Sequence, residues 1–350
     1  MPPQKGECLI LTKRNIVPKV VAFGGGTGLS TMLRGLKALT PNITAVVTMA
    51  DDGGSSGYLR RELGILPPGD IRNCIVALAE AEPSMKKLLQ YRFSSGNLSG
   101  QCFGNLLLAA VFGISNDFEE TVNAVSDVLR VTGRVLPVTV ENVIIEAQLE
   151  NKEIVKGESK IGKAALEMKS RIEKVRLVPA DAKPVAGVLK AIEEADIIVL
   201  GPGSLYTSII PNLIVDGVAD AVKASRAVKI YVCNIMTQPG ETDNMDAFAH
   251  AKAICDHAGG KIMDYCVVNN EGVPEPLLKR YIEDGAQIVE VHPEQFISNK
   301  IKLVELPCVH TATGNVRHDY QKLAKGVFDI YSKHLRQSFA PLLNFKGYSV

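Results

Sequence analysis

The chain has 350 residues, of which 46% are hydrophobic and 22% are charged, a composition that is typical of globular proteins and excludes long disordered stretches. Lys and Arg number 39 and Asp and Glu number 38, which gives a formal net charge of +1. The chain therefore lacks the basic excess that marks a nucleic-acid-binding protein. No apolar run reaches the roughly 18 residues that a membrane span needs.

Seven cysteines are scattered along the chain without a C-x-x-C pair, so we expect free thiols in a reducing compartment rather than a structural zinc site. The apolar patch near the N-terminus is too short for the core of a signal peptide. We therefore predict a cytoplasmic protein that begins with a flexible tail at residues 1–18.

Apolar runs at residues 19–23 and 43–49 predict two buried strands, and the leucine spacing between them predicts a helix. A loop at residues 50–57 comes next, and then a helix for which Asp70 is a suitable N-cap. Residues 83–130 are predicted to form only helices and loops.

The segment at residues 135–178 has a different pattern, which predicts a small mostly-β insertion or an antiparallel extension of the main sheet. From residue 185 onward, helices and strands alternate until a last helix that begins at Asp319. Such alternation predicts an α/β fold with a mostly parallel sheet covered by helices on both faces. We expect a single domain at residues 19–335 and a C-terminal tail at residues 336–350. The strands expected in these segments are residues 136–140, 143–149, 153–155, 174–178, 196–200, 227–232 and 261–268.

Four glycines fall within residues 24–28, directly after the first predicted strand. Glycines let the backbone approach an anion closely, and the N-terminus of the next helix offers free N–H groups. A tight turn needs only one or two glycines, so we favour phosphate binding, with the Thr27 hydroxyl as a further donor. The G-x-G-x-x-G fingerprint requires glycine at position 29, which is a leucine, and no P-loop motif is present, so the ordinary dinucleotide and P-loop interpretations are weakened.

Two carboxylates, Asp51 and Asp52, come directly after the second predicted strand. They suit Mg²⁺ bound through water, or hydrogen bonds from a ribose or sugar hydroxyl, and the residues alone leave the two alternatives open. A turn with Asx capping is the structural alternative.

Further polar residues come after other predicted strands or begin helices. Gly203, Ser204 and Tyr206 come after the strand at residues 196–200, and the residues after the strand at 227–232 suit a base edge or a sugar. In open α/β sheets, ligands bind beyond the carboxyl ends of the strands. Because several such loops lie directly after strands here, we predict that they converge on a nucleotide-like, phosphate-bearing ligand. The residues concerned in the remaining loops are Asn73, Asn105, Asn234, Thr237, Gln238, Arg317 and His318.

Four stretches, VVAFGGGTGLSTMLRGLK, ITAVVTMADDGGSSGYLRRELGILPPGDIRN, GPGSLYTSIIPNL and YVCNIMTQPGET, closely resemble the bacterial gluconeogenesis factor family (YvcK type), in the 2-phospho-L-lactate transferase superfamily. The resemblance implies a Rossmann-like sheet, a cytoplasmic location, and a role in cell shape and in growth on gluconeogenic carbon sources. It implies binding of UDP-sugars, notably UDP-N-acetylglucosamine, without an established reaction. The transferase relatives move a phospholactyl group from a nucleotide diphosphate with Mg²⁺.

The resemblance also implies specific ligand contacts. Tyr281 and Arg317 match residues tied to UDP-sugar binding in the family. The family has a His after Ser-Gly in the fourth loop, where this chain has Gln101, which favours binding over acid–base chemistry. We assign no catalytic residue and take Asp51 and Asp52 as candidate metal ligands. The candidate ligand-binding residues are Gly25, Gly26, Thr27, Gly28, Asp52, Asn73, Asn105, Gly203, Ser204, Tyr206, Asn234, Thr237, Gln238, Tyr281 and Arg317.

Two function classes are favoured by this sequence. The first is a regulator that senses a UDP-sugar and acts through a protein partner in cell-wall precursor metabolism, with no obligatory cofactor. The second is a Mg²⁺-dependent transferase that acts on a substrate linked to a nucleotide diphosphate. An NAD-dependent oxidoreductase is the least favoured class, although NAD remains an alternative ligand for a pyrophosphate site. Self-association through an apolar helix face is a further expectation.

Overall fold

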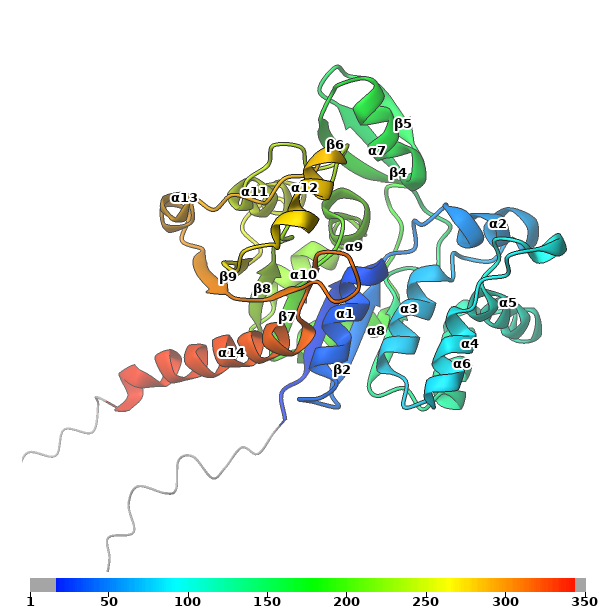
Figure 1. The fold of residues 1–350 in the computed structure, drawn as a ribbon. Helices are drawn as coiled ribbons and strands as arrows, with labels where there is room; N and C mark the ends of the chain where they lie inside the picture. The colour runs from blue at the N-terminus through cyan, green and yellow to red at the C-terminus, as the bar shows by residue number, and fades with distance from the viewer. Residues whose placement is uncertain (1–16, 344–350) are drawn as a thin grey trace, which may run out of the picture.

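The computed structural model describes residues 17–343, with side chains described to residue 337. Its centre is a seven-stranded sheet in the order β10-β9-β8-β7-β1-β2-β3, in which every neighbouring pair is parallel. This confirms the predicted α/β fold with a Rossmann-like parallel sheet (Figure 1). The strands are β1 (Val20–Gly24), β2 (Ile43–Val47), β3 (Arg134–Pro137), β7 (Ile197–Leu200), β8 (Val228–Val232), β9 (Tyr265–Asn269) and β10 (Lys302–Leu306).

The central strands are buried on both sides, because helices cover both faces of the sheet. Every residue of β1, β2 and β7 is buried, which explains their continuous apolar sequences. The crossovers run in one direction from β1 to β3 and in the other from β7 to β10. Because such parallel crossovers are right-handed as a rule, the helices of the two halves lie on opposite faces. The helices α1 (Gly26–Leu36), α3 (Gly69–Leu78) and α14 (Tyr320–Leu343) pack together. The second half contains α8 (Ala186–Glu194), η2 (Leu205–Ile209), α9 (Ile210–Leu213), α10 (Val218–Ala224) and α11 (Ala247–His257).

Residues between β2 and β3 form helices, as predicted for residues 83–130. The predicted loop at residues 50–57 is shorter than expected, because α2 (Gly54–Leu63) already includes its last four residues. Gly57 is needed inside α2, since a Cβ atom there would lie 1.9 Å from the Asp52 carbonyl oxygen. The other elements are α4 (Pro83–Gln90), η1 (Gly96–Leu98), α5 (Phe103–Ser115) and α6 (Phe118–Val128).

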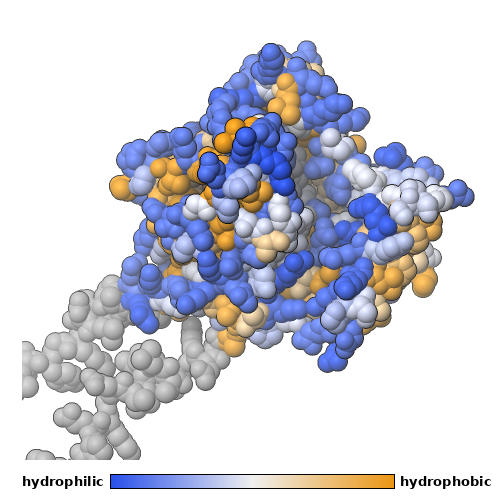
Figure 2. Space-filling view, in the orientation of Figure 1, coloured by the Kyte–Doolittle hydropathy of each residue, from blue (hydrophilic) through white to orange (hydrophobic). Residues whose placement is uncertain are grey.

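An exposed apolar surface lies on α5 and α6, at the right of Figure 2. Ile114 is 86% exposed and Val128 is 80% exposed, and α5 carries no charged residue. The self-association expected from the sequence would use this apolar helix face.

The β-rich segment is a separate insertion, not an extension of the main sheet. It contains an antiparallel three-stranded sheet in the order β5-β4-β6 and a helix, α7, that the sequence pattern did not predict. The predicted strand at residues 136–140 instead overlaps β3, which pairs with β2 at the edge of the main sheet. The elements of the insertion are β4 (Ile144–Leu149), β5 (Ile154–Lys156), α7 (Glu158–Glu167) and β6 (Ile172–Val178).

The C-terminal third contains several short elements that the sequence pattern did not predict. The helix α14 also continues to Leu343, past residue 335, where the C-terminal tail was expected to begin; residues 1–16 and 344–350 of the two expected tails lie outside the described residues. The additional elements are α12 (Glu275–Glu283), α13 (Pro293–Ser298), β10, β11 (Val309–His310) and β12 (Arg317–His318).

Between residues 17 and 343, no single helix is long and apolar enough to cross a membrane. One bent pair of helices, Leu205–Leu213 with Val218–Ala224, is together long and apolar enough to cross a membrane by length and composition alone. Its residues Ile209, Leu213 and Val222 are buried in the protein core, where they pack against the sheet.

Candidate functional site

A cavity of about 460 Å³ lies where the loops after β1, β7 and β8 meet. The strands β1 and β7 are neighbours at the point where the strand order reverses, which is the usual ligand position in an open α/β sheet. The volume lies within the range of small-molecule sites. Eleven of the candidate residues line this cavity: Gly25, Gly26, Thr27, Gly28, Gly203, Ser204, Asn234, Thr237, Gln238, Tyr281 and Arg317.

The glycine loop brings the N-terminus of α1 to the cavity. Gly26 has φ of 56°, and a Cβ atom on Gly28 would lie 2.3 Å from the Pro202 carbonyl oxygen, so glycine is required where the two loops touch. No side chain caps α1 from its N-cap position, and Asp70 accepts a hydrogen bond from the Gly26 N–H. The remaining N–H groups of the first turn and the helix dipole favour an anion there.

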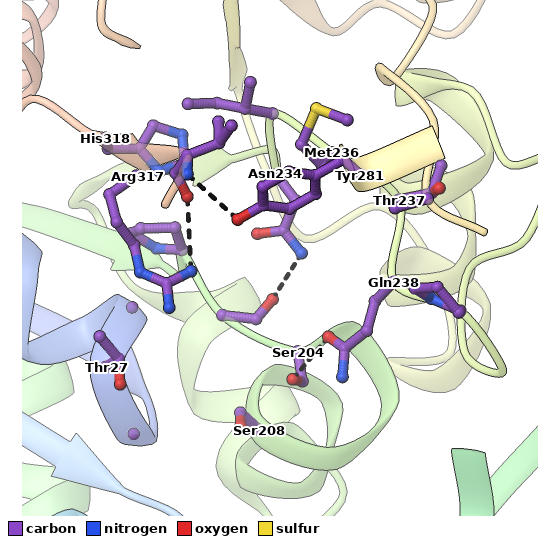
Figure 3. Close-up of a pocket in the computed structure, with 18 of the residues that line it drawn as sticks. Thr27, Ser204, Ser208, Asn234, Met236, Thr237, Gln238, Tyr281, Arg317 and His318 are labelled. Atoms are coloured by element: carbon purple, nitrogen blue, oxygen red, sulfur yellow. Dashed lines mark hydrogen bonds between the residues drawn. The ribbon is translucent and has the colours of Figure 1, made fainter. Parts of the chain in front are cut away.

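The loops after β7 and β8 hold each other in place through side-chain hydrogen bonds. Ser204 Oγ donates to Gln238 Oε1 at 2.8 Å, and Asn234 Nδ2 donates to the Gly203 carbonyl oxygen at 2.9 Å (Figure 3). Thr237 Oγ1 accepts a hydrogen bond from the Gln287 backbone N–H at 2.8 Å. These amide and hydroxyl groups form a preorganised polar wall.

The third wall comes from α12 and β12. The backbone N–H of Val316 donates to Tyr281 Oη at 3.1 Å, which fixes the tyrosine beside the Arg317 strand (Figure 3). Arg317 Nη1 donates to the Val316 carbonyl oxygen at 3.4 Å, and the guanidinium makes no ion pair with any described residue. This cation is therefore free to bind an anionic ligand.

His318 also lines the cavity but has a structural partner. Its Nε2 donates to the Cys233 carbonyl oxygen at 3.2 Å, which ties β12 to the end of β8. Burial lowers the pKa of His318 to about 4, so the imidazole is neutral near pH 7 and its pairing leaves Arg317 as the cation of this wall.

Four candidate residues lie outside the cavity. Arg72 donates to the side-chain oxygens of both Asn73 and Asn105, each at 2.8 Å. Asp52 Oδ1 accepts from the Ser159 N–H at 2.8 Å, at the beginning of α7. Tyr206 is 5% exposed and packs edge-on against His257 with 5.9 Å between ring centroids. Except for Arg72 beside Asn73, these partners lie far away in the sequence, so the local pattern did not reveal them.

Carboxylates gather next to the glycine loop. Burial and the neighbouring Asp51 charge raise the pKa of Asp70 to about 7, while the Gly26 N–H donates to its carboxylate. Burial, with Asp51 as the next cause, raises the pKa of Glu158 to about 8. The described residues contain no group of three or more His, Cys, Asp or Glu side chains arranged to hold a metal ion.

Some cavity residues were not among the predicted site residues. Asp284 and Ala286 line the cavity, at the end of a helix that was not predicted. The only sequence feature that could have indicated Asp284 as a cavity residue is its position one helical turn after Tyr281. Ser208 also lines the cavity and belongs to the predicted hydroxyl-rich loop after β7.

The fold and this site define a Rossmann-like α/β protein with a polar cavity at its topological switch point. A family profile described as 2-phospho-L-lactate transferase CofD matches residues 20–309. The chain is 57% identical to a relative from Thermoanaerobacterium thermosulfurigenes, over 88% of this chain and 95% of that protein. It is 44% identical to the protein named gluconeogenesis factor of Bacillus subtilis, over 89% of this chain and 98% of that protein.

The fold is also similar to a crystal structure of a member of the UPF0052 family from Bacillus halodurans. The TM-score is 0.85 at 45% identity, with 89% of this chain and 99% of that chain covered. The chain belongs to the gluconeogenesis factor family, within the wider CofD family.

Proposed function

We propose that this protein binds a UDP-sugar, with UDP-N-acetylglucosamine as the first candidate, and acts in the cytoplasm as a regulator of cell-wall precursor supply and cell shape during gluconeogenic growth. The observation that carries the proposal is the convergence of the α1 N-terminus, the free Arg317 and a wall of amides and hydroxyls on one cavity. The first two suit a diphosphate, and the third suits a base or a sugar. The name of the Bacillus subtilis relative supports the link to gluconeogenesis.

A binding role fits the side chains better than acid–base catalysis does. The Nε2 of His318 is committed to the Cys233 carbonyl oxygen. Gln101, in place of the family His, accepts a hydrogen bond from Ser55 Oγ at 2.9 Å and is buried. A regulator of this kind would transmit the bound state through a protein partner. Six described cysteines are free thiols, which supports a reducing compartment.

The test is calorimetric titration and thermal unfolding with UDP-N-acetylglucosamine, UDP, GDP and NAD, each with and without Mg²⁺. A ligand at about 100 times its Kd stabilises the fold by about 2.7 kcal/mol. We expect UDP-N-acetylglucosamine to raise the unfolding temperature selectively, whether or not Mg²⁺ is present. Arg317→Ala should weaken binding at least about tenfold, because a charge-assisted contact is lost. Lys325→Ala, which removes an exposed cation on α14, is the matched control. Selective binding of GDP or NAD instead would contradict the proposal.

A second candidate is a Mg²⁺-dependent transferase, favoured by the carboxylates beside the glycine loop. Asp51 and Asp70 repel each other electrostatically, and a divalent cation between such a pair relieves repulsion. Asp52 is less suited to this role because one of its oxygens holds α7. Nucleotide binding that requires Mg²⁺ and is lost in Asp70→Asn would favour this candidate over the regulator.

A further inference from the structure

The two ends of the cavity differ in electrostatic character. Thr27 and Arg317 lie on one side, and Thr237 and Gln238 lie across from them (Figure 3). The first side has the unpaired Arg317 guanidinium and the N-terminal end of α1, whose Gly26 N–H is already bound by Asp70. The second side has the C-terminal end of α12, which carries a partial negative charge.

Asp284 adds a full negative charge at this second end. It is a solvent-exposed residue that lines the cavity, and it is the C-cap of α12, where its backbone N–H donates to the Arg280 carbonyl oxygen. No described residue donates a hydrogen bond to its carboxylate or forms an ion pair with it. The adjoining Gly285 packs near Pro239, with 3.7 Å from its ideal Cβ position to the proline ring, which fixes this end of α12 beside the loop after β8.

An unpaired carboxylate in a cavity can only accept hydrogen bonds. It attracts hydroxyl or amide N–H groups and repels a phosphate. A sugar presents several hydroxyl donors, whereas a ribose presents two and a uracil ring one. The acidic end of the cavity therefore suits an uncharged sugar better than it suits a nucleoside or a further phosphate.

We propose that Asp284 is a specificity-determining residue. The diphosphate binds at the α1 and Arg317 end, and Asp284 accepts hydrogen bonds from the sugar at the other end. The carboxylate at the same time excludes nucleoside triphosphates, whose third phosphate would take the place of the sugar. This inference rests on the proposed UDP-sugar binding and goes beyond it by assigning the selection against UTP to one side chain.

The experiment is calorimetric measurement of Kd for UDP-N-acetylglucosamine, UDP and UTP with three proteins: the native chain, Asp284→Asn and Glu283→Gln. Asp284→Asn preserves the side-chain shape and removes the charge. Glu283→Gln removes the same charge one residue earlier, on a residue that is exposed, as Asp284 is, but lies outside the cavity lining. Thermal unfolding of each protein without ligand checks that folding is preserved.

The native chain should bind UDP-N-acetylglucosamine more tightly than UTP. Asp284→Asn should reduce the ratio of the Kd for UTP to the Kd for UDP-N-acetylglucosamine by roughly tenfold or more, because it weakens the contact with the sugar and removes the repulsion of the third phosphate of UTP. Glu283→Gln should leave this ratio unchanged. A ratio that Asp284→Asn does not change, in a native chain that binds UDP-N-acetylglucosamine, overturns this inference alone. If the native chain binds neither nucleotide, the proposed function itself fails.

Discussion

At the scale of single residues, close backbone contacts shape the site. The glycine loop and the loop after β7 approach so closely that the Gly28 position has no room for a side chain: a Cβ atom would lie 2.3 Å from the Pro202 oxygen and 2.7 Å from the Pro202 carbonyl carbon. Backbone atoms cannot move aside as the end of a flexible side chain can. The contact between the loops after β1 and β7 therefore depends on glycine at position 28.

Gly28→Ala should push these two loops apart. We expect the free energy of unfolding to fall by about 1–3 kcal/mol, as for other overpacked positions, and ligand affinity to fall with it. Urea unfolding and calorimetric titration measure the two effects. Gly113→Ala is the control, because a Cβ atom there meets nothing within 4 Å and alanine in a helix is more stable than glycine by roughly 1 kcal/mol. Equal stability of the two variants would contradict the proposed contact.

At the scale of elements, the insertion is attached to the main domain through the loop after β2. Asp52 binds the Ser159 N–H at the first turn of α7, so its carboxylate complements the positive end of that helix. Gly240 also lies against the Gly162 backbone of α7. These contacts hold α7 beside the loops that form the cavity.

Asp52→Ala should therefore act as the loss of a helix cap. We expect a destabilisation of about 1 kcal/mol and faster amide hydrogen exchange confined to residues 158–167. Asp52→Asn should largely restore protection because the amide oxygen can still accept. Asp117→Ala, which removes the cap of α6 at Glu120, should cost a similar amount without affecting α7. Loss of Mg²⁺-dependent binding with unchanged α7 exchange would instead favour the predicted metal-ligand role of Asp52.

At the scale of the whole molecule, buried carboxylates should make the stability depend on pH. Burial raises the pKa of Glu241 to about 7 from an ordinary value of 4.5. Below pH 4.5 the carboxyl is protonated in both states and has no effect. Between pH 4.5 and 7 the unfolded chain releases the proton first, so the free energy of unfolding falls as the pH rises.

Glu241→Gln isolates this contribution. The variant and the native chain should have similar stability at pH 4, and at pH 8 the variant should be more stable by up to about 3 kcal/mol. Comparing the two proteins cancels the opposite effect of buried His318, whose lowered pKa makes stability rise between about pH 4 and 6.5. Urea unfolding across pH 4–8 measures the difference, and parallel curves would contradict the raised pKa.

The sequence by itself determined the α/β class, the parallel sheet and the convergence of loops at the carboxyl ends of β1, β7 and β8. These features depend on local periodicity and on the residue types directly after each strand, and both are visible in a short window of sequence. The glycine loop, Ser204, Asn234 and Thr237 could be placed for that reason.

Only the tertiary structure decided which polar side chains reach the cavity. Asp52 is bound to Ser159, 107 residues away, and Asn105 is bound to Arg72, 33 residues away. Packing between distant elements sets such partners, and no local pattern reports them. For the same reason the sequence did not predict that α12, with Asp284 at its end, lies at the cavity. It also did not predict that β3 pairs within the main sheet while β4, β5 and β6 form a separate sheet.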